Sequence, residues 1–320
     1  MSEATSFWIA SPHRVELRRT PLPPLAPGHV RVQTRYSGIS RGTERLVHSG
    51  AVPPSEFARM RAPFQGGDLP GPVKYGYCAV GRIVAGDAAR LGERVFALHP
   101  HQDVFDIPGD AALALPAALP ERTAPLAAHL ETAINALWDQ PPRIGDRIAI
   151  VGLGAVGLCL AKLIAAIPGV ELYGIDPSPH ARARAGLADA CAGRCNLVFH
   201  TSGTEAGLTR AIELAGFEAT IVELSWYGAL APKVPLGGAF HSQRLTLAAS
   251  QVGTLAQAKR ATHTHKTRLE LALRLLADPA NRLDLGMATR FEQLPERYSQ
   301  LLDDPAASPL PLVAYGDSDV

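Results

Sequence analysis

Hydrophobic and polar residues alternate over short distances in the first third of the chain. Val30–Tyr36 (VRVQTRY) alternates strictly, as a half-buried β-strand does, and residues 7–20 have the pattern of two short strands around a turn. Residues 74–86 and 93–108 each have the pattern of a further strand pair, with turns rich in proline and glycine between them. We therefore expect the first 110 or so residues to be mostly β-structure.

The pattern changes in the centre, where fully apolar runs alternate with helical segments. The apolar runs expected to form strands are Ile148–Val151, Val170–Ile175, Leu197–Thr201, Ala219–Leu224 and residues 244–250. Helices are expected at Ala155–Ala166 and Thr204–Ala215, and another in residues 178–190 with its arginines facing solvent. Strands that alternate with helices predict βαβ crossovers, and therefore a parallel, doubly wound α/β sheet.

Beyond residue 260 the pattern changes again. Residues 266–278 form an amphipathic helix in which Leu269, Leu273 and Leu276 share one face, and residues 292–304 form a shorter helix. Residues 309–315 (PLPLVAY) have the pattern of a strand, so we expect the tail to return to the β-rich first domain. The predicted division is a β-rich domain of residues 1–120 and 265–320, and an α/β domain of residues 121–264.

Composition and charge narrow the class of protein. Of the 320 residues, 47% are hydrophobic and 19% are charged, which is ordinary globular composition, and the net charge is +1. We therefore expect no nucleic-acid partner and no membrane association. The first residues lack a basic segment followed by an apolar run, and four cysteines without paired CxxC motifs fit a reducing compartment, so a cytoplasmic location is expected. Cys191 and Cys195 could form half of a metal site, but no second pair accompanies them.

The central apolar run leads into a glycine motif. Gly152, Gly154 and Gly157 have G-x-G-x-x-G spacing between a predicted strand and a predicted helix. This motif turns the chain tightly, lets a pyrophosphate approach the backbone, and places the phosphates at a helix N-terminus. The residues expected to hold the dinucleotide here are Gly152, Leu153, Gly154, Ala155, Val156 and Gly157.

An acidic residue follows the motif at the end of the next predicted strand. Asp176, followed by Pro177, is close to the offset of ~20 residues expected for a carboxylate that binds the ribose hydroxyls. The same carboxylate would repel a 2′-phosphate. The sequence therefore predicts NAD(H) as the cofactor in preference to NADP(H).

The order of these elements resembles the medium-chain dehydrogenase/reductase superfamily over essentially the whole chain. The motifs that carry the resemblance are VRVQTRYSGIS followed by a G-T-E step, and GYCAVGRIVAG before GERVFAL. Within that superfamily, SGISRGTERLVHSG and GGAFHSQRLTLAASQVG are most similar to the bacteriochlorophyllide-type 2-hydroxyethyl dehydrogenases. The resemblance implies a GroES-like β-rich domain beside a Rossmann domain, and a homodimer formed by the last Rossmann strand, residues 244–250.

The zinc ligands of the superfamily are absent. Arg41 lies near the position of the first ligand cysteine, Tyr77 replaces the ligand histidine of the Gly-His-Glu motif, and the third ligand would fall near Ala128-His129. The four-cysteine structural zinc lobe is also missing. A shifted alignment that recruits Cys78, His99 and His101 stays open, but we expect no zinc.

Without zinc, other side chains must polarise the substrate oxygen and move its proton. The candidates near the superfamily's catalytic position are Arg41, Thr43, Tyr77, His99 and His101. Each has a simpler interpretation. Arg41 could pair with Glu44, Thr43 could cap a helix, Tyr77 could be a core aromatic, and the histidines could form a solvated edge. If His99 and His101 lie on a strand, both rings point to one side.

The resemblance adds Thr132, Thr201 and Ser202 to the cofactor site. Ser178 and Arg182 follow Asp176, and Arg182 could stack on adenine or attract a 2′-phosphate. The leading hypothesis is a zinc-independent, NAD(H)-dependent oxidoreductase that acts on a secondary alcohol or ketone. The small-molecule substrate would meet aromatic and cationic side chains, with Trp226-Tyr227 among the candidates. The alternatives are an enoyl- or quinone-type NAD(P)H reductase, and a dinucleotide-binding protein without turnover.

Overall fold

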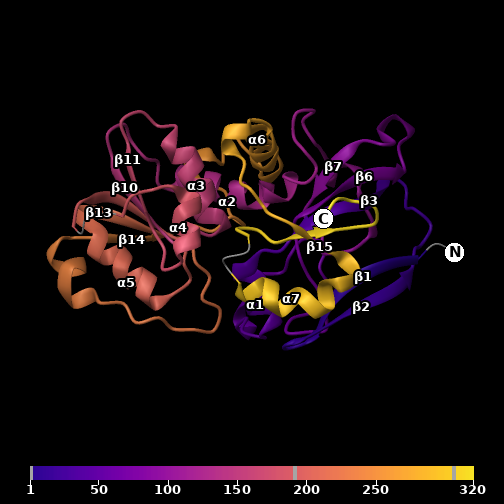
Figure 1. Ribbon diagram of the computed structural model, residues 1–320, viewed down its shortest axis with the longest axis horizontal. Coiled ribbons are helices and arrows are strands. Elements are labelled where there is room, and N and C mark those ends of the chain that lie inside the picture. Colours follow the sequence, from indigo (N-terminus) through magenta and orange to yellow (C-terminus); the bar gives the residue numbers. More distant parts are fainter. Residues whose placement is uncertain (1–2, 190–192, 305–307) are drawn as a thin grey trace. The chain divides into compact units, whose positions relative to one another are not determined.

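The computed structural model describes residues 3–189, 193–304 and 308–320, and Figure 1 labels many of its helices and strands. The chain divides into two compact units. One unit comprises Met1–Ala128 and Leu273–Val320, and the other comprises His129–Ala272. The chain passes between them within helices α2 (Ala127–Asp139) and α6 (His265–Ala277), whereas the sequence analysis placed the boundaries at residues 120/121 and 264/265.

The first unit is built from two sheets. The four-stranded sheet has the order β2-β1-β5-β4, and its strands are β1 (Glu3–Ser11), β2 (Arg14–Pro21), β4 (Gly66–Gly67) and β5 (Val73–Lys74). The seven-stranded sheet has the order β15-β16-β3-β6-β7-β9, with β8 also paired to β3. Its strands are β3 (His29–Gly38), β6 (Ala79–Ala85), β7 (Arg94–Ala97), β8 (Val104–Pro108), β9 (Leu113–Ala114), β15 (Ala288–Arg290) and β16 (Leu312–Ala314).

The alternating residues of β3 are buried as the sequence pattern predicts. Val30 and Val32 pack in one core cluster with Ile83 of β6 and with Phe105 and Ile107 of β8. Two helices complete the unit, α1 (Arg41–His48) and α7 (Leu294–Asp303). The tail returns to this unit, because β16 pairs antiparallel with β3, with Val313 opposite Ser37.

The second unit contains a five-stranded parallel sheet in the order β11-β10-β12-β13-β14. The strands are β10 (Arg147–Val151), β11 (Glu171–Ile175), β12 (Cys195–His200), β13 (Ala215–Glu223) and β14 (Thr246–Ala249), and the helices are α3 (Ala155–Ala165), α4 (Pro179–Ala185) and α5 (Glu205–Leu214). A parallel bridge between Tyr173 and Ala188 continues the sheet beyond β11. The order reverses between β10 and β12, which is the switch point where open α/β sheets bind ligands.

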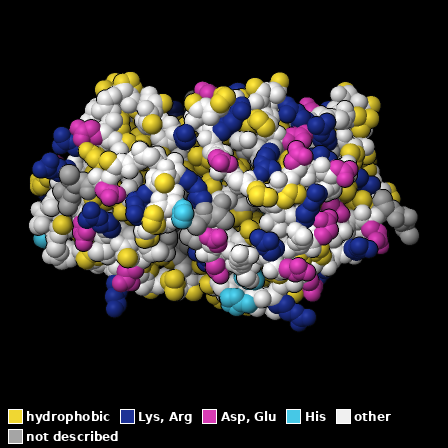
Figure 2. All heavy atoms as spheres, in the orientation of Figure 1, with side chains coloured by type: hydrophobic (Ala, Val, Ile, Leu, Met, Phe, Trp, Pro, Cys, Tyr) yellow, Lys and Arg dark blue, Asp and Glu magenta, His cyan; other side chains and the backbone are white. Residues whose placement is uncertain are grey.

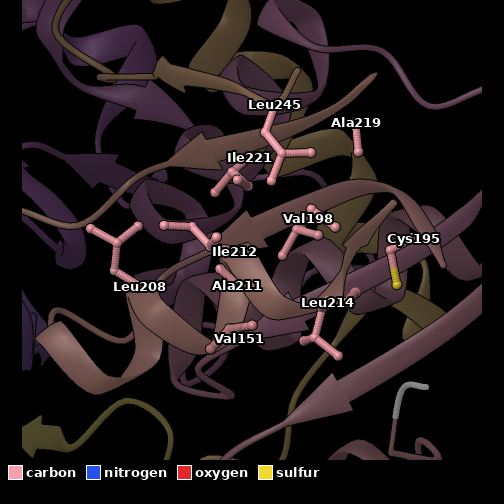
Figure 3. Packing of buried hydrophobic residues seen from close by; sticks show 12 residues of the cluster. Val151, Cys195, Val198, Leu208, Ala211, Ile212, Leu214, Ala219, Ile221 and Leu245 are labelled. Carbon is pink, nitrogen blue, oxygen red and sulfur yellow. The ribbon is translucent and has the colours of Figure 1, made fainter. Parts of the chain in front are cut away.

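Helix α5 covers part of this sheet through an apolar cluster (Figure 3). Leu208, Ala211 and Ile212 of α5 pack in one cluster with Val198 of β12 and Ile221 of β13. The helix begins after Thr204, whose side chain accepts a hydrogen bond from the backbone N–H of Gly207. This packing fixes the N-terminus of α5 beside the carboxyl end of β12.

Helix α4 is shorter than the sequence pattern indicated. It ends at Ala185 because Gly186, with φ of +62°, takes the left-handed conformation that terminates helices. Of its arginines, Arg184 is exposed, whereas Arg182 is half-buried. The predicted architecture, a β-rich domain and a domain with a parallel doubly wound sheet, is confirmed.

Candidate functional site

The glycine motif lies where β10 ends and α3 begins. Gly152 has φ of +101°, and a Cβ there would lie 2.6 Å from the backbone nitrogen of Ser202. A Cβ at Gly157 would overlap the carbonyl oxygen of Gly152. These two glycines are therefore required by backbone conformation and close approach. Gly154 differs, because a Cβ there would have no atom within 4 Å. The position that a side chain would take at Gly154 therefore faces open space.

Asp176 is fixed beside this loop, directly after β11. Its Oδ2 accepts a hydrogen bond of 2.8 Å from the backbone N–H of Leu153, and its Oδ1 accepts one of 2.8 Å from that of Ser178. Each carboxylate oxygen has two lone pairs, so both retain acceptor capacity for a ligand. The carboxylate thus occupies a defined place next to the glycine loop.

Arg182 lies close to the same strand end but is engaged with the main chain. Its Nη1 donates to the carbonyl oxygens of Asp176 at 2.6 Å and Pro177 at 3.1 Å. Its guanidinium therefore helps to hold the turn that carries Asp176. Thr132, the remaining candidate outside the switch point, is half-buried on α2.

Thr201 and Ser202 form the opposite side of the switch point, after β12. The Thr201 hydroxyl donates to the carbonyl oxygen of Gly152 at 2.6 Å, which ties this loop to the glycine loop. The Ser202 hydroxyl lies 2.6 Å from Nε2 of His200, and Nδ1 of His200 lies 2.7 Å from Oε2 of Glu223. His200 and Glu223 were not predicted from the sequence, although they are the last residues of two adjacent parallel strands, β12 and β13.

In the first unit, Tyr77 belongs to a cluster of hydroxyl groups. Its phenol donates to the hydroxyl of Ser40 at 2.5 Å and lies 3.2 Å from that of Thr43. Tyr77 and Thr43 are half-buried. Burial raises the pKa of the Tyr77 phenol well above its ordinary value, so it stays protonated near neutral pH. Helix α1 begins at Arg41 with Ser40 as its N-cap residue, so Thr43 lies inside the first turn and is not the cap.

Arg41 points to a different element. Its Nε donates to the carbonyl oxygen of Leu301 at 2.9 Å and its Nη2 to that of Asp304 at 2.7 Å, at the C-terminal end of α7. A cation is favourable there, because the last carbonyl groups of a helix carry partial negative charge. Glu44, the partner that the sequence suggested for Arg41, is fully buried and accepts hydrogen bonds from the backbone N–H of Ser40 and from the hydroxyl of Tyr298.

The alternative interpretation of His99 and His101 as a solvated edge is wrong, since these residues are 4% and 1% exposed. They lie in the loop between β7 and β8, not on a strand. Nε2 of His101 lies 3.1 Å from Oε2 of Glu44, and its Nδ1 lies 2.7 Å from the hydroxyl of Ser37. His99 stacks on Phe105 with ring centroids 3.7 Å apart, and burial lowers its pKa well below the ordinary value.

The donor groups around Tyr77 do not fit a catalytic zinc ion. Such a site needs three ligands of the thiolate, imidazole or carboxylate type, whereas Tyr77 and Ser40 offer neutral hydroxyl groups. Over the three described ranges, no group of three or more His, Cys, Asp or Glu side chains is placed to hold a metal ion, and Cys78, His99 and His101 do not form one. Cys191, the other cysteine considered with Cys195, lies outside the described residues.

The surface shows no accumulation of one charge on the face seen in Figure 2, where Lys and Arg side chains are mixed with Asp and Glu. None of the helices in the described part of the chain has the length and apolar character needed to cross a membrane.

The chain is similar to known dehydrogenases in sequence and in fold. No protein-family model matches the chain. The chain is 33% identical over 187 residues to the 2-desacetyl-2-hydroxyethyl bacteriochlorophyllide A dehydrogenase of Cereibacter sphaeroides. That match covers 52% of this chain, and the chain spans only about half (54%) of the length of this curated relative.

Solved structures match over nearly the full length. An alcohol dehydrogenase of Escherichia coli CFT073 complexed with NADH has a TM-score of 0.75 at 17% identity, with 98% of this chain and 100% of that chain covered. A zinc-binding dehydrogenase of Sinorhizobium meliloti bound to NADP has a TM-score of 0.73 at 16% identity, with 98% and 100% covered. The chain therefore has the fold of the medium-chain alcohol dehydrogenases, a GroES-like domain and a Rossmann domain.

Proposed function

We propose that the protein is an NAD(H)-dependent oxidoreductase of the medium-chain dehydrogenase/reductase type that acts on a secondary alcohol or its ketone. The observation that carries this proposal is the fixed position of the Asp176 carboxylate beside the glycine loop, bonded to the N–H groups of Leu153 and Ser178. This is the arrangement that a dinucleotide fold uses to bind a ribose. The similarity to a 2-hydroxyethyl bacteriochlorophyllide dehydrogenase supports a secondary alcohol as the substrate class.

The residues of the loop and strand ends fit NAD(H) as the cofactor. Gly154 leaves open space on the side of the loop where a pyrophosphate would lie, and the N-terminus of α3 offers N–H groups and positive dipole to it. Asp176 would accept hydrogen bonds from ribose hydroxyls and repel a 2′-phosphate, which favours NAD(H) over NADP(H). When bound, the nicotinamide supplies or accepts the hydride.

We propose that the reaction needs no zinc and that Tyr77 holds the transferred proton. The phenol of Tyr77 is protonated at neutral pH, because a phenol ordinarily titrates near pH 10 and burial raises this pKa further. When the Ser40 hydroxyl turns to donate to it, the phenol can donate its own proton to a substrate carbonyl oxygen. Ser40 and Thr43 accept from or donate to the same hydroxyl, and Thr43 is a route by which the proton could pass onward. Arg41 is held by α7, and His101 is enclosed, so Tyr77 is the stronger candidate for contact with substrate.

We also propose a homodimer formed by pairing of β14 across a two-fold axis. This strand is at the edge of the parallel sheet, and Leu247 within it is 39% exposed. An exposed edge strand with an apolar side chain is a surface that proteins usually cover.

The test combines binding, metal content and turnover on the purified protein. Titration of nicotinamide fluorescence should give clearly tighter binding of NADH than of NADPH, and oxidation of secondary alcohols with NAD should proceed without added metal. Equal or tighter NADPH binding would overturn the cofactor assignment. Near-stoichiometric zinc in protein purified without chelators, lost together with activity on chelation, would overturn the zinc-independent chemistry.

A further inference from the structure

The carboxyl ends of β12 and β13 carry a buried chain of hydrogen bonds that the proposed chemistry does not use. His200 ends β12 and is fully buried, and its Nδ1 lies 2.7 Å from Oε2 of Glu223, which ends β13. Because a carboxylate only accepts hydrogen bonds, Nδ1 carries the ring proton when the imidazole is neutral. Nε2 is then the acceptor, and the Ser202 hydroxyl donates to it over 2.6 Å.

The groups around Glu223 strengthen this assignment. The backbone N–H of Ser225 donates to Oε1 of Glu223 at 2.7 Å, and the hydroxyl of Tyr227 donates to Oε2 at 3.2 Å. Burial and the charge of Glu223 raise the pKa of Tyr227, so its hydroxyl remains a donor. The Tyr227 ring also stacks on that of His200, with centroids 6.4 Å apart. The carboxylate is therefore surrounded by hydrogen-bond donors from His200, Ser225 and Tyr227.

Ser202 connects this pair to the glycine loop. Its backbone nitrogen faces Gly152, where a Cβ would come within 2.6 Å, and the neighbouring Thr201 hydroxyl bonds to the Gly152 carbonyl oxygen. The N–H of Gly203 donates to the Ser225 hydroxyl at 3.0 Å, which joins the loops after β12 and β13. Residues 201–204 thus form one side of the switch point. The buried His200 ring contacts them through its hydrogen bond with Ser202.

The Ser202–His200–Glu223 distances resemble those of a hydrolytic triad, but the hydroxyl lies in the wrong place for nucleophilic attack. A Cβ at Gly207 would overlap Oγ of Ser202 and lie 2.8 Å from Nε2 of His200. The hydroxyl is therefore pressed against the first turn of α5, where it also accepts a hydrogen bond of 3.3 Å from the N–H of Thr204. Its environment is that of a loop anchor.

We infer that His200 and Glu223 are positioning residues for the dinucleotide: they fix the proton on Nδ1, orient Ser202, and so hold residues 201–204 against the glycine loop. This inference rests on the proposed dinucleotide binding. Because the His200 ring is fully buried, it does not touch a ligand, and its effect on binding acts through Ser202. Loss of the correct ring tautomer should therefore weaken NADH binding even when the fold is intact.

The variant that tests this is Glu223→Gln, which preserves the shape of the side chain. The N–H of Ser225 needs an acceptor and keeps the amide oxygen on its side, so the NH2 group faces Nδ1 and donates to it. The ring proton then moves to Nε2, and Ser202 can no longer donate to that nitrogen. We expect the NADH dissociation constant to rise about tenfold, with a changed tautomer of His200 in the ¹⁵N NMR spectrum. His200→Gln should weaken binding to a similar extent. His241→Ala, an exposed histidine of the same unit, is the matched control and should bind NADH as the unmodified protein does.

The outcomes separate this inference from the proposed function. If the unmodified protein does not bind NADH, the proposed function itself fails. If the unmodified protein binds NADH and Glu223→Gln binds it equally tightly despite the changed tautomer, the positioning role alone is overturned. Weaker binding by Glu223→Gln with an unchanged His200 tautomer would also overturn it, because the loss would not act through the ring. All measurements are made well below the melting temperature of each variant.

Discussion

The hydroxyl groups of Tyr77 and Ser40 lie 2.5 Å apart, so the phenol is held by a residue at the N-terminus of α1. If Tyr77 donates to the substrate oxygen, Tyr77→Phe should lower kcat by about 10²–10³-fold, the usual cost of losing one such donor. The NADH dissociation constant should be unchanged. Steady-state kinetics and fluorescence titration check this, with Tyr173→Phe, which removes a hydroxyl bonded to exposed Glu171, as the control. Full turnover by Tyr77→Phe would exclude the phenol as the donor.

Replacing the carboxylate at the end of β11 should change the cofactor preference. Asp176→Ser removes the negative charge that repels a 2′-phosphate, while a hydroxyl can still accept from the N–H of Leu153 or Ser178. We expect weaker NADH binding, stronger NADPH binding, and a smaller ratio between the two dissociation constants. Parallel titrations with both cofactors measure the ratio. An unchanged ratio would show that Asp176 does not contact the ribose.

Arg41→Ala should lower the stability of the protein and leave its turnover nearly unchanged. The guanidinium binds two carbonyl oxygens at the end of α7, so its loss should lower the free energy of unfolding by about 1 kcal/mol. Below the melting temperature, kcat should stay within a few-fold of the unmodified value. Urea unfolding and kinetics on the same preparation check both expectations, with Arg59→Ala, an exposed arginine paired to Glu56, as the control. A loss of kcat comparable to that of Tyr77→Phe would contradict this prediction and indicate that Arg41 takes part in catalysis.

Two buried histidines should make the first unit sensitive to acid. Burial lowers the pKa of both His48 and His99 from the ordinary 6.5. Below pH 6.5 the unfolded chain binds protons that the folded chain does not, so the stability from these groups is complete above pH 6.5 and falls as pH decreases. Urea unfolding at pH 7.5 and pH 5.5 should show this loss. His48→Gln should reduce the difference between the two pH values, whereas the exposed His241→Gln should not.

If the homodimer forms through the edge strand β14, a charge introduced on that strand should prevent dimerisation. Leu247→Lys places a cation on β14, where it would meet its symmetry mate in a paired edge, so the variant should be monomeric at micromolar concentration. Light scattering should give a dimer for the unmodified protein. NADH binding should be retained in the variant, because the switch point lies between β10 and β12. A monomeric unmodified protein would contradict the dimer.

Local patterns were sufficient to predict much of the fold. The alternation in β3 and the apolar run before Gly152 each identify a strand from a few neighbouring residues, and the place of Asp176 after β11 follows from its offset to the glycine motif. The glycine loop could be predicted because its residues are close in the sequence and their spacing reflects backbone conformation.

The cluster around Tyr77 could not be predicted in the same way. Tyr77 meets Ser40 across 37 positions, and Arg41 meets Leu301 across 260 positions, so neither partner is visible from spacing. Superfamily motifs directed attention to Arg41, whereas in the structure its neighbour Ser40 carries the hydroxyl that faces Tyr77. His200 and Glu223 were missed because their significance depends on the pairing of β12 with β13 in register.

The return of β16 to β3 has a consequence for how the chain folds during synthesis. All five strands of the parallel sheet are available once residue 249 has been made, so this sheet can form from a contiguous segment. The seven-stranded sheet cannot be completed until residues 312–314 are made, because β16 lies between β3 and β15. During translation residues 36–38 of β3 therefore lack their β16 partner while all strands of the parallel sheet have already been made.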